Sequence, residues 1–367
     1  TDMEESLRGE FISKLSLSSQ FSFFFPSFVS PRLRQKPPTM KAVVCSQFGL
    51  PDTLQVLDIP SPIPSSKQVV ISVEACGVNF PDVLIIQNKY QFTPELPFSP
   101  GGEVAGTIVE LGDEVQGLEL GQRVLALCGW GGFAEKVAVD LDRVFPLPPG
   151  LSAEVAATTL YTYGTSYHAL KDRAQLQAGE TLLVLGAAGG VGLAAVELGT
   201  LMGARVIAAA STEEKLALCR EKGAVETINY ETEDLKTRIK ELTGGKGVDV
   251  VYDPVGGKFS EAALRGMAWK GRYLVVGFAN GEIPKLPMNL PLLKGCAVVG
   301  VFWGQFAKLE PKASLQNTRQ LLAWIQEGAI AQHVGKKYTL YEAPQALQDL
   351  MDRKMLGKGV VLLVASI

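Results

Sequence analysis

The most informative segment of the chain is Thr181–Ser211, which reads TLLVLGAAGGVGLAAVELGTLMGARVIAAAS. Leu182–Leu185 form a short apolar run that ends abruptly at a glycine, which is typical of a buried strand. An apolar helix and a second strand, Arg205–Ala209, follow. This order of strand, turn, helix and strand predicts the first half of a dinucleotide-binding unit.

Three glycines recur at every third position of the turn: Gly186, Gly189 and Gly192. The first turns the chain tightly, the second lets the backbone approach a pyrophosphate, and the third lets the helix pack closely on the strand. The helix directs its N-terminal N–H groups at the same place. We therefore expect this turn, including Gly190 and Val191, to bind a dinucleotide.

The composition excludes several classes of protein. The chain has 367 residues, which is enough for two domains with sizeable cores. It carries 35 basic and 38 acidic residues without a long basic run, which argues against nucleic acid as the primary partner. Five scattered cysteines are typical of a reducing compartment, and two histidines are too few for a histidine-rich metal site. No apolar run approaches the ~20 residues that span a bilayer, so we expect no membrane span.

The first 39 residues differ from the rest. From Phe11 to Thr39 there is no acidic residue, while serine, phenylalanine and basic residues are frequent. One interpretation is an organelle-targeting presequence, although three glutamates precede Phe11. The other is a disordered leader ahead of a natural start at Met40. The compartment therefore stays open between cytoplasmic and mitochondrial, and residues 1–39 are left out of the predicted fold.

Two kinds of pattern divide the remaining chain. From Met40 to about Tyr163, short β-branched runs separated by glycine and proline predict a β-barrel-like domain. Further on, predicted helices alternate with predicted strands, which indicates a parallel, doubly wound sheet. The helices are expected at Thr212–Lys222, Asp234–Leu242 and Phe259–Met267, and the strands at Glu226–Asn229, Val248–Tyr252 and Tyr273–Val276.

The C-terminal part predicts a return to the first domain. A helix near Leu315–Glu327 precedes a β-rich tail whose clearest strand is Val360–Val364. We expect this tail to pack on the β-rich half, so that the first domain comprises residues 40–163 and 303–367. Residues 164–302 then form the dinucleotide-binding domain.

Charge at the end of the second strand favours NADPH as the dinucleotide. Folds that prefer NAD place an acidic residue there, about 20 residues after the glycines. Here the position is taken by the neutral Ala210 or Ser211, and Lys215 follows one helical turn later. The alternative for Lys215 is a solvated helix residue, and Glu213 and Glu214 reduce the positive charge nearby.

Several motifs together resemble the medium-chain dehydrogenase/reductase superfamily and, within it, the zinc-free quinone oxidoreductase branch. They include ACGVNFPD (75–82), PGGEVAG (100–106), GAAGGVG (186–192), GVDVVYDPVGG (247–257) and VFWG (301–304). The resemblance spans Met40 to the C-terminus. It implies a Rossmann-type doubly wound parallel sheet inserted in a GroES-like β-barrel catalytic domain, and a homodimer.

The same motifs indicate whether the chain carries the zinc ligands of related dehydrogenases. Zinc alcohol dehydrogenases of the superfamily carry a cysteine where Asn79 stands, a histidine where Gly102 stands, and a four-cysteine lobe where only Cys128 is found. Catalytic zinc needs three protein ligands and structural zinc four, so we expect no metal site. Alcohol oxidation then lacks the Lewis acid that makes an alkoxide. Hydride transfer to a quinone or an α,β-unsaturated carbonyl needs only hydrogen bonds to the oxyanion and a solvent proton.

The resemblance implies roles for further residues. Asn79 and Tyr90 are expected at the substrate, although Asn79 could instead be a buried residue at a turn. Leu84 replaces a tyrosine of bacterial relatives, so one hydroxyl is lost from the expected cleft. The expected coenzyme ligands outside the glycine turn are Thr165, Ser211, Lys215, Tyr230, Gly277, Phe278, Phe302, Trp303 and Arg353.

Some of these residues keep a second interpretation. Thr165 could cap a helix N-terminus, and Trp303 could be a core aromatic. Asp82 is interpreted as structural, and His168 as a packing residue.

The leading hypothesis is an NADPH-dependent reductase of small-molecule quinones or enones. The alternatives are an enoyl-thioester reductase of the same superfamily, which requires a suitably placed tyrosine proton donor, and a non-catalytic NADPH-binding protein.

Overall fold

The structure is a computed structural model that describes residues 38–363. The predicted leader, residues 1–39, lies outside this range apart from Pro38 and Thr39. No helix between residues 38 and 363 is long and apolar enough to cross a membrane.

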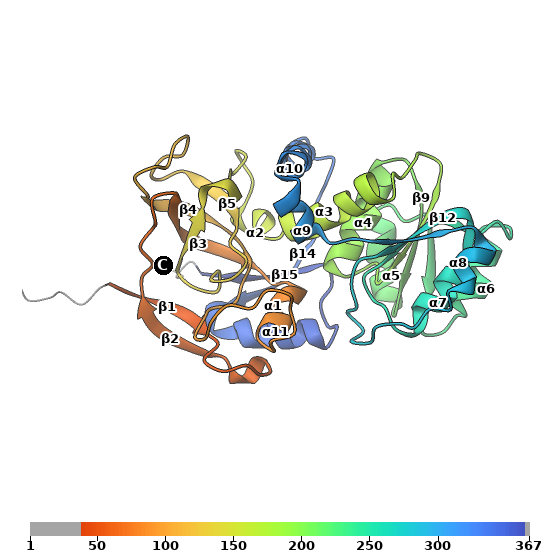
Figure 1. The fold of residues 1–367 in the computed structure, drawn as a ribbon, viewed down its shortest axis with the longest axis horizontal. Helices are drawn as coiled ribbons and strands as arrows, with labels where there is room; N and C mark the ends of the chain where they lie inside the picture. Colours follow the sequence, from red (N-terminus) through yellow and green to blue (C-terminus); the bar gives the residue numbers. More distant parts are fainter. Residues whose placement is uncertain (1–37, 364–367) are drawn as a thin grey trace, which may run out of the picture. The chain divides into compact units, whose positions relative to one another are not determined.

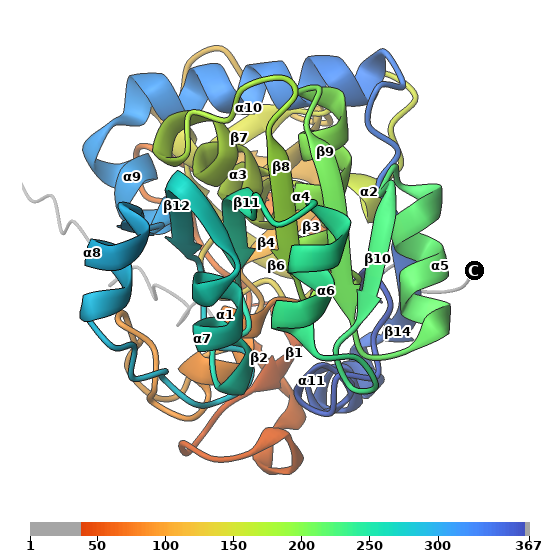
Figure 2. The same ribbon diagram turned by 90° about the vertical axis from the view of Figure 1, so that its right-hand side faces the viewer.

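A six-stranded parallel sheet forms around the glycine turn (Figure 2). Its strand order is β10-β9-β8-β11-β12-β13, and every neighbouring pair is parallel. The chain runs outward from β8 on one side and from β11 on the other, so the order reverses between these two strands. The strands are β8 (Thr181–Leu185), β9 (Arg205–Ala210), β10 (Glu226–Asn229), β11 (Val248–Asp253), β12 (Met267–Val275) and β13 (Ala297–Gly300).

Helices cover both faces of this sheet because its strands are apolar on both sides. Along β8, Leu182 and Val184 pack into one core, whereas Leu183 and Leu185 pack into another. The first core contains residues of α3 (Leu160–Tyr167), α4 (Gly190–Leu201), α5 (Glu213–Glu221) and α10 (Pro311–Gln326). The second contains residues of α6 (Leu235–Leu242), α7 (Lys258–Arg265) and α8 (Asn289–Lys294).

The remaining strands form a largely antiparallel sheet with its own core (Figure 1). Its order is β14-β15-β3-β4-β5-β7, β6 pairs with β3, and only β14 and β15 are parallel. The strands are β3 (Gln68–Gly77), β4 (Glu103–Leu111), β5 (Arg123–Leu127), β6 (Lys136–Asp140), β7 (Val144–Pro146), β14 (Val334–Thr339) and β15 (Lys358–Leu362). A separate antiparallel ribbon contains β1 (Thr39–Val44) and β2 (Gln55–Pro60).

The C-terminal tail returns to this antiparallel sheet, as the sequence predicted. β15 pairs with β3 in register Val361 to Cys76, although the two strands are far apart in the chain. The fold class, a Rossmann-type parallel sheet inserted in a β-rich catalytic domain, is therefore confirmed. Four helices accompany this part of the fold: α1 (Phe80–Ile85), α2 (Ala153–Ala156), α9 (Trp303–Leu309) and α11 (Ala343–Met351).

Four element predictions differ from the structure. The tail contains the helix α11, which buries Ala343, Ala346 and Leu347 at helical spacing. The helix predicted up to Met267 ends at Arg265, and β12 begins six residues before its predicted start. Lys270 has a positive φ of 62° inside β12, and the sequence Trp-Lys-Gly at that point has the composition of a turn. The last strand, predicted as Val360–Val364, is Lys358–Leu362, and Val364 lies outside the described residues.

Candidate functional site

The glycine turn has the geometry of a phosphate cradle. Gly186 adopts a φ of +57°, and a Cβ atom there would lie 2.7 Å from Val255 Cγ2. A Cβ atom on Gly192 would lie 2.2 Å from the carbonyl oxygen of Gly186, so α4 packs on the turn only without a side chain. Gly189 is the N-cap of α4, whose first-turn N–H groups are suited to an anion. The turn follows β8, where the strand order reverses and parallel sheets open a ligand crevice.

The C-terminal segment lies against this turn. The Gly357 N–H donates to the Ala188 carbonyl at 2.9 Å, and Gly357 forms a parallel bridge with Gly189. A Cβ atom on Gly190 would lie 3.4 Å from Lys358 Cδ. Residues from β15 and the loop before it therefore border the start of α4, where Val191 also lies.

Four of the predicted coenzyme ligands lie together at the ends of β9 and β10. Lys215 Nζ donates to Ser211 Oγ at 3.1 Å and to the Arg353 carbonyl at 3.2 Å. Burial raises the pKa of Tyr230 to about 12, and the positive charge of Arg353 acts against this shift. The Arg353 guanidinium donates to Asn280 Oδ1 at 2.6 Å. This cluster holds two cations at the position where an NAD-preferring fold places a carboxylate.

One of the two glutamates near the cluster is paired on its own helix. Glu213 forms an ion pair with Arg220 on the same helix. Lys215 reaches Ser211 and Arg353, so its side chain is not the freely solvated residue of the alternative interpretation.

The predicted nicotinamide ligands lie on three elements. Thr165 is inside α3, whose N-cap is Thr159, so the alternative that Thr165 caps this helix is wrong. Gly277 and Phe278 follow β12, and the Gly277 N–H donates to the Asp253 carbonyl at the end of β11 at 3.3 Å. These two residues therefore lie beside the carboxyl ends of the strands that adjoin the crevice.

Phe302 and Trp303 differ in exposure. Phe302 is the N-cap of α9 and is 43% exposed, whereas Trp303 is 9% exposed. A Cβ atom on Gly164 would lie 2.7 Å from the Trp303 indole, so the indole rests directly on the backbone of α3. Trp303 is thus part of a core, and its ring also lines the space beside Tyr161, with 5.6 Å between ring centroids.

Asn79 lies in a buried polar network. Its backbone N–H donates to Asp82 Oδ2 at 2.8 Å, and Asn79 is the N-cap of α1. Lys358 Nζ donates to the side-chain oxygen Oδ1, and the side-chain Nδ2 donates to the Gly77 carbonyl at 3.2 Å. Asp82 also accepts from the Gly101 N–H at 3.2 Å, which fits the predicted structural role. The Asn79 amide is therefore held by protein groups on both sides.

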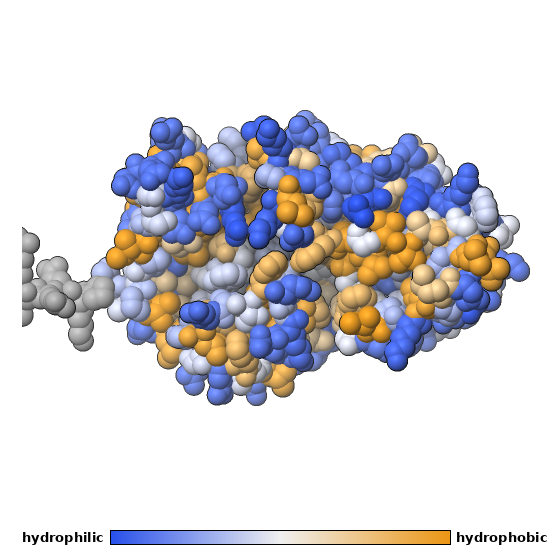
Figure 3. Space-filling view, in the orientation of Figure 1, coloured by the Kyte–Doolittle hydropathy of each residue, from blue (hydrophilic) through white to orange (hydrophobic). Residues whose placement is uncertain are grey.

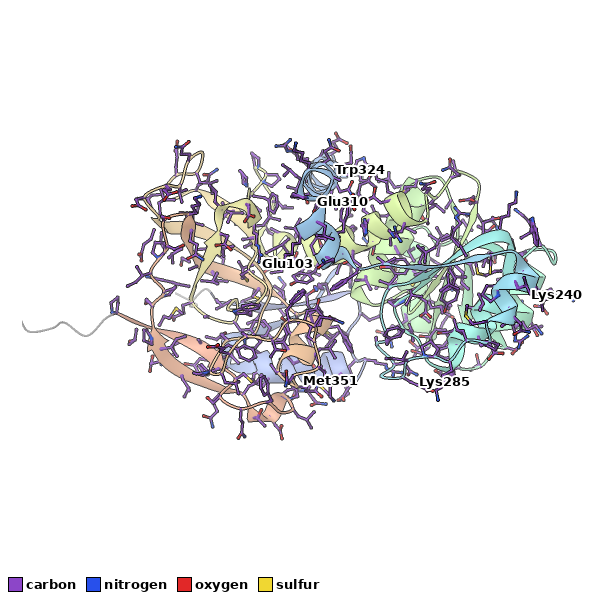
Figure 4. All side chains as sticks on the ribbon, in the orientation of Figure 1. Glu103, Lys240, Lys285, Glu310, Trp324 and Met351 are labelled. Carbon is purple, nitrogen blue, oxygen red and sulfur yellow. The ribbon has the colours of Figure 1, made fainter. Side chains whose placement is uncertain are left out.

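The sequence analysis missed two members of this network, Glu103 and Lys358. Glu103, labelled in Figure 4, is fully buried at the start of β4. Its Oε1 accepts from the N–H groups of Leu160 and Tyr161 at the beginning of α3, and its Oε2 has no partner among the described residues. Burial raises the pKa of Glu103 and of Asp82 to about 7, while the charge of Lys358 acts against both shifts.

Lys358 is buried as well, and its burial lowers its own pKa. From the sequence, a lysine at the start of a C-terminal strand is expected to be solvated. Its burial becomes evident only from the structure, in which β15 pairs with β3. Tyr90, the second predicted substrate residue, packs against the core of the antiparallel sheet. Burial and the charge of Asp82 raise the pKa of Tyr90.

Between residues 38 and 363 no group of three or more His, Cys, Asp or Glu side chains could hold a metal ion. His168 stacks on Phe306 with 3.9 Å between ring centroids and contacts Asp172 at 2.9 Å, which fits a packing residue.

Comparison with known proteins adds to this geometry. Residues 65–149 match the alcohol dehydrogenase GroES-like domain, and residues 190–325 match the zinc-binding dehydrogenase family. The quinone oxidoreductase-like protein 2 homolog of Nematostella vectensis is 40% identical over 324 residues, which cover 88% of each chain. The Escherichia coli quinone oxidoreductase complexed with NADPH superposes with a TM-score of 0.82 at 28% identity, covering 89% of this chain and 99% of the other. A mycobacterial protein complexed with NADPH has a TM-score of 0.83 at 32% identity, with coverages of 88% and 100%.

Proposed function

This chain belongs to the quinone oxidoreductase family of the medium-chain dehydrogenase/reductase superfamily, and we propose that it reduces quinones or α,β-unsaturated carbonyls with NADPH. The observation that carries the choice of coenzyme is the cluster around Lys215 at the end of β9. Lys215 and Arg353 supply two cations, and Ser211 and Tyr230 supply hydroxyl groups, as the 2′-phosphate of NADPH requires.

The rest of the crevice fits the same dinucleotide. The start of α4 and the glycine turn would hold the pyrophosphate. Thr165, Gly277, Phe278 and the α9 aromatics would surround the nicotinamide end. When bound, NADPH supplies a hydride to an electron-poor acceptor.

The protein must stabilise the charge that this transfer creates. A hydride adds to a carbon atom of the acceptor, an electron pair moves to the carbonyl oxygen, and a solvent proton completes the reduction. The developing oxyanion needs fixed hydrogen-bond donors in a site of low dielectric constant. The donor must come from the part of the antiparallel domain that holds Tyr90 and the buried network of Asn79, beside the α9 aromatics.

We also propose that the protein is a homodimer joined along β13. This strand is at the edge of the parallel sheet, and Val298 is 45% exposed. At the end of the strand the Gly300 carbonyl accepts from Arg173 Nε at 3.0 Å, so the free part of the edge in the described chain is around Val298. Apolar atoms gather over the neighbouring surface in Figure 3. Exposed edges and large apolar patches are typical of interfaces, and a second β13 would cover both. The exposed apolar residues of this region are Trp269, Ile283, Met288, Leu292 and Leu293.

A coenzyme and acceptor panel tests the proposed reaction. Purified protein is mixed with NADPH or NADH and with 9,10-phenanthrenequinone, a 1,4-quinone, an enone or a crotonyl thioester. We expect NADPH oxidation with the quinones, unchanged by metal chelators. Binding of NADPH without faster oxidation by any quinone or enone would contradict the proposed function. Turnover of the thioester alone would favour the enoyl-thioester alternative.

A further inference from the structure

A tyrosine that sequence analysis did not single out lies among the residues expected at the substrate, near Tyr90 and Asp82. Tyr161 is the second residue of α3, and its side chain lies directly over Gly102 at the start of β4. A Cβ atom on Gly102 would lie 2.7 Å from Tyr161 Oη and 3.2 Å from Cζ. The phenol therefore fills the volume that any side chain at position 102 would need.

The ring is held from several sides. The Tyr161 backbone N–H donates to Glu103 Oε1 at 3.2 Å, which fixes the start of α3 on β4. The ring meets Trp303 edge to face, with 5.6 Å between centroids and 60° between planes. Trp303 in turn rests on Gly164, so the indole beside the phenol is supported by the backbone of α3.

The hydroxyl of this tyrosine is available as a donor. Among residues 38–363 it makes no hydrogen bond, and it is not one of the fully enclosed polar atoms. Burial raises the pKa of Tyr161 well above its usual value, and the nearby charges of Asp82 and Glu103 raise it further. Cys128 and Tyr90 act in the same direction. The phenol therefore keeps its proton at neutral pH, and a desolvated O–H group without an acceptor is costly.

Asn79 is less suited to this role. Its Oδ1 accepts from Lys358 and its Nδ2 donates to Gly77, so a substrate oxygen would have to displace a protein partner. Within the part of the chain that the structure describes, the hydroxyl of Tyr161 has no partner to lose.

Resting on the proposed function, we propose that Tyr161 is a catalytic residue that donates a hydrogen bond to the carbonyl oxygen of the acceptor above Gly102. The hydride that NADPH would supply leaves its C–H bond and forms a new C–H bond at the β-carbon of the acceptor. The C=C electron pair shifts to the adjoining C–C bond, the C=O pair moves to this oxygen, and Oη–H stabilises the resulting oxyanion. A solvent proton then neutralises the oxygen, and the phenol keeps its own proton.

Tyr161→Phe tests the proposal, with Tyr163→Phe as the matched control. Tyr163 is on the same helix, but its hydroxyl donates to Glu197 on α4, away from the cleft. Loss of one oxyanion donor typically costs ~100-fold in rate, so we expect kcat/KM of Tyr161→Phe to fall by about that factor with an enone. The dissociation constant for NADPH, measured by fluorescence, should stay within twofold. Tyr163→Phe should keep kcat/KM near the wild-type value even if its melting temperature falls.

Two further measurements keep the result decisive. Gly102→Ala retains the hydroxyl but displaces it, and should reproduce the kinetic loss of Tyr161→Phe. Binding of a 1,4-quinone to the protein saturated with NADP⁺ requires no turnover, and Tyr161→Phe should weaken it at least fivefold. If the wild type reduces acceptors and Tyr161→Phe matches it in both assays, the role of Tyr161 is refuted and the proposed function stands. If the wild type reduces no acceptor, the proposed function fails, and the quinone-binding assay still decides whether Tyr161 contacts the ligand.

Discussion

Replacing Lys358 with methionine is expected to destabilise the fold strongly at pH 8 and much less at pH 6. Lys358, Glu103 and Asp82 are 6%, 0% and 1% exposed, so two carboxyl groups share one lysine in the interior. Lys358 Nζ donates to Asn79 and forms no ion pair within 4 Å of a carboxylate among the described residues, so it acts on Glu103 and Asp82 through its charge. The ~3–5 kcal/mol that removing one partner of a buried ion pair typically costs is therefore an upper bound for this change. Here a proton can limit that cost, since the pKa of each carboxyl group is about 7 even with the lysine present.

The sign of the pH dependence follows from proton uptake. The unfolded chain holds no proton on either carboxyl group above pH 6, whereas the folded variant keeps its protons because its carboxyl pKa values rise further without Lys358. The free energy of unfolding therefore falls as pH rises. In the wild type both carboxyl groups lose their protons near pH 7, so the free energy of unfolding stops falling above that pH. In the variant, each carboxyl group that stays protonated lowers the free energy of unfolding by about 1.4 kcal/mol per pH unit. The destabilisation of the variant relative to the wild type should therefore be about 1–3 kcal/mol larger at pH 8 than at pH 6.

Urea denaturation followed by fluorescence at the two pH values measures this difference. Lys67→Met is the control, because Lys67 pairs with Glu114 at 3.7 Å on the surface and both side chains are more than half exposed. Such pairs contribute ~0–1 kcal/mol, so the control should change little at either pH. The facing groups that titrate are Glu103, Asp82 and the Cys76 thiol, whose pKa burial raises. An equal loss at both pH values would refute the proposed coupling of Lys358 to the two carboxyl groups.

Three further changes test the coenzyme site and the proposed dimer. Lys215→Glu should weaken NADPH binding by ~10–100-fold, the value of a charge-assisted hydrogen bond, and NADH binding far less; equal losses in fluorescence titrations would rule out a 2′-phosphate contact. Gly192→Ala places a Cβ atom 2.2 Å from the Gly186 carbonyl oxygen, so we expect a lower melting temperature and no measurable NADPH binding, and normal binding would contradict the cradle. Val298→Asp puts a charge on the free edge of β13 and should give monomers in sedimentation velocity, whereas an unchanged dimer would place the contact elsewhere.

The sequence predicted what depends on neighbours in the chain. The apolar run of β8, the glycine spacing and the alternation of helices and strands are local, so the parallel sheet and its turn were predictable. The side chain of Tyr161 was not, because TTLYTYGTSY contains three tyrosines and the pattern does not tell which of them faces the cleft. Lys358 was missed for a similar reason: a lysine at the start of a strand is normally exposed, and its burial depends on β3, about 280 residues away.

The contact of Tyr161 with Gly102 also explains how a cleft of this fold can supply an electrophile from the protein itself. Position 102 is where the zinc alcohol dehydrogenases of the superfamily carry a histidine, and here a Cβ atom at that position would overlap the phenol. A metal-binding side chain at position 102 and the hydroxyl of Tyr161 therefore exclude each other, since they need the same volume beside the same backbone. A metal held by a side chain at position 102 would polarise an oxygen of the substrate as a Lewis acid. The hydroxyl of Tyr161 would polarise the same oxygen by donating a hydrogen bond. Gly102→His alone should thus create a clash rather than a metal ligand, and a zinc site could be built here only after Tyr161 is also replaced by a small residue.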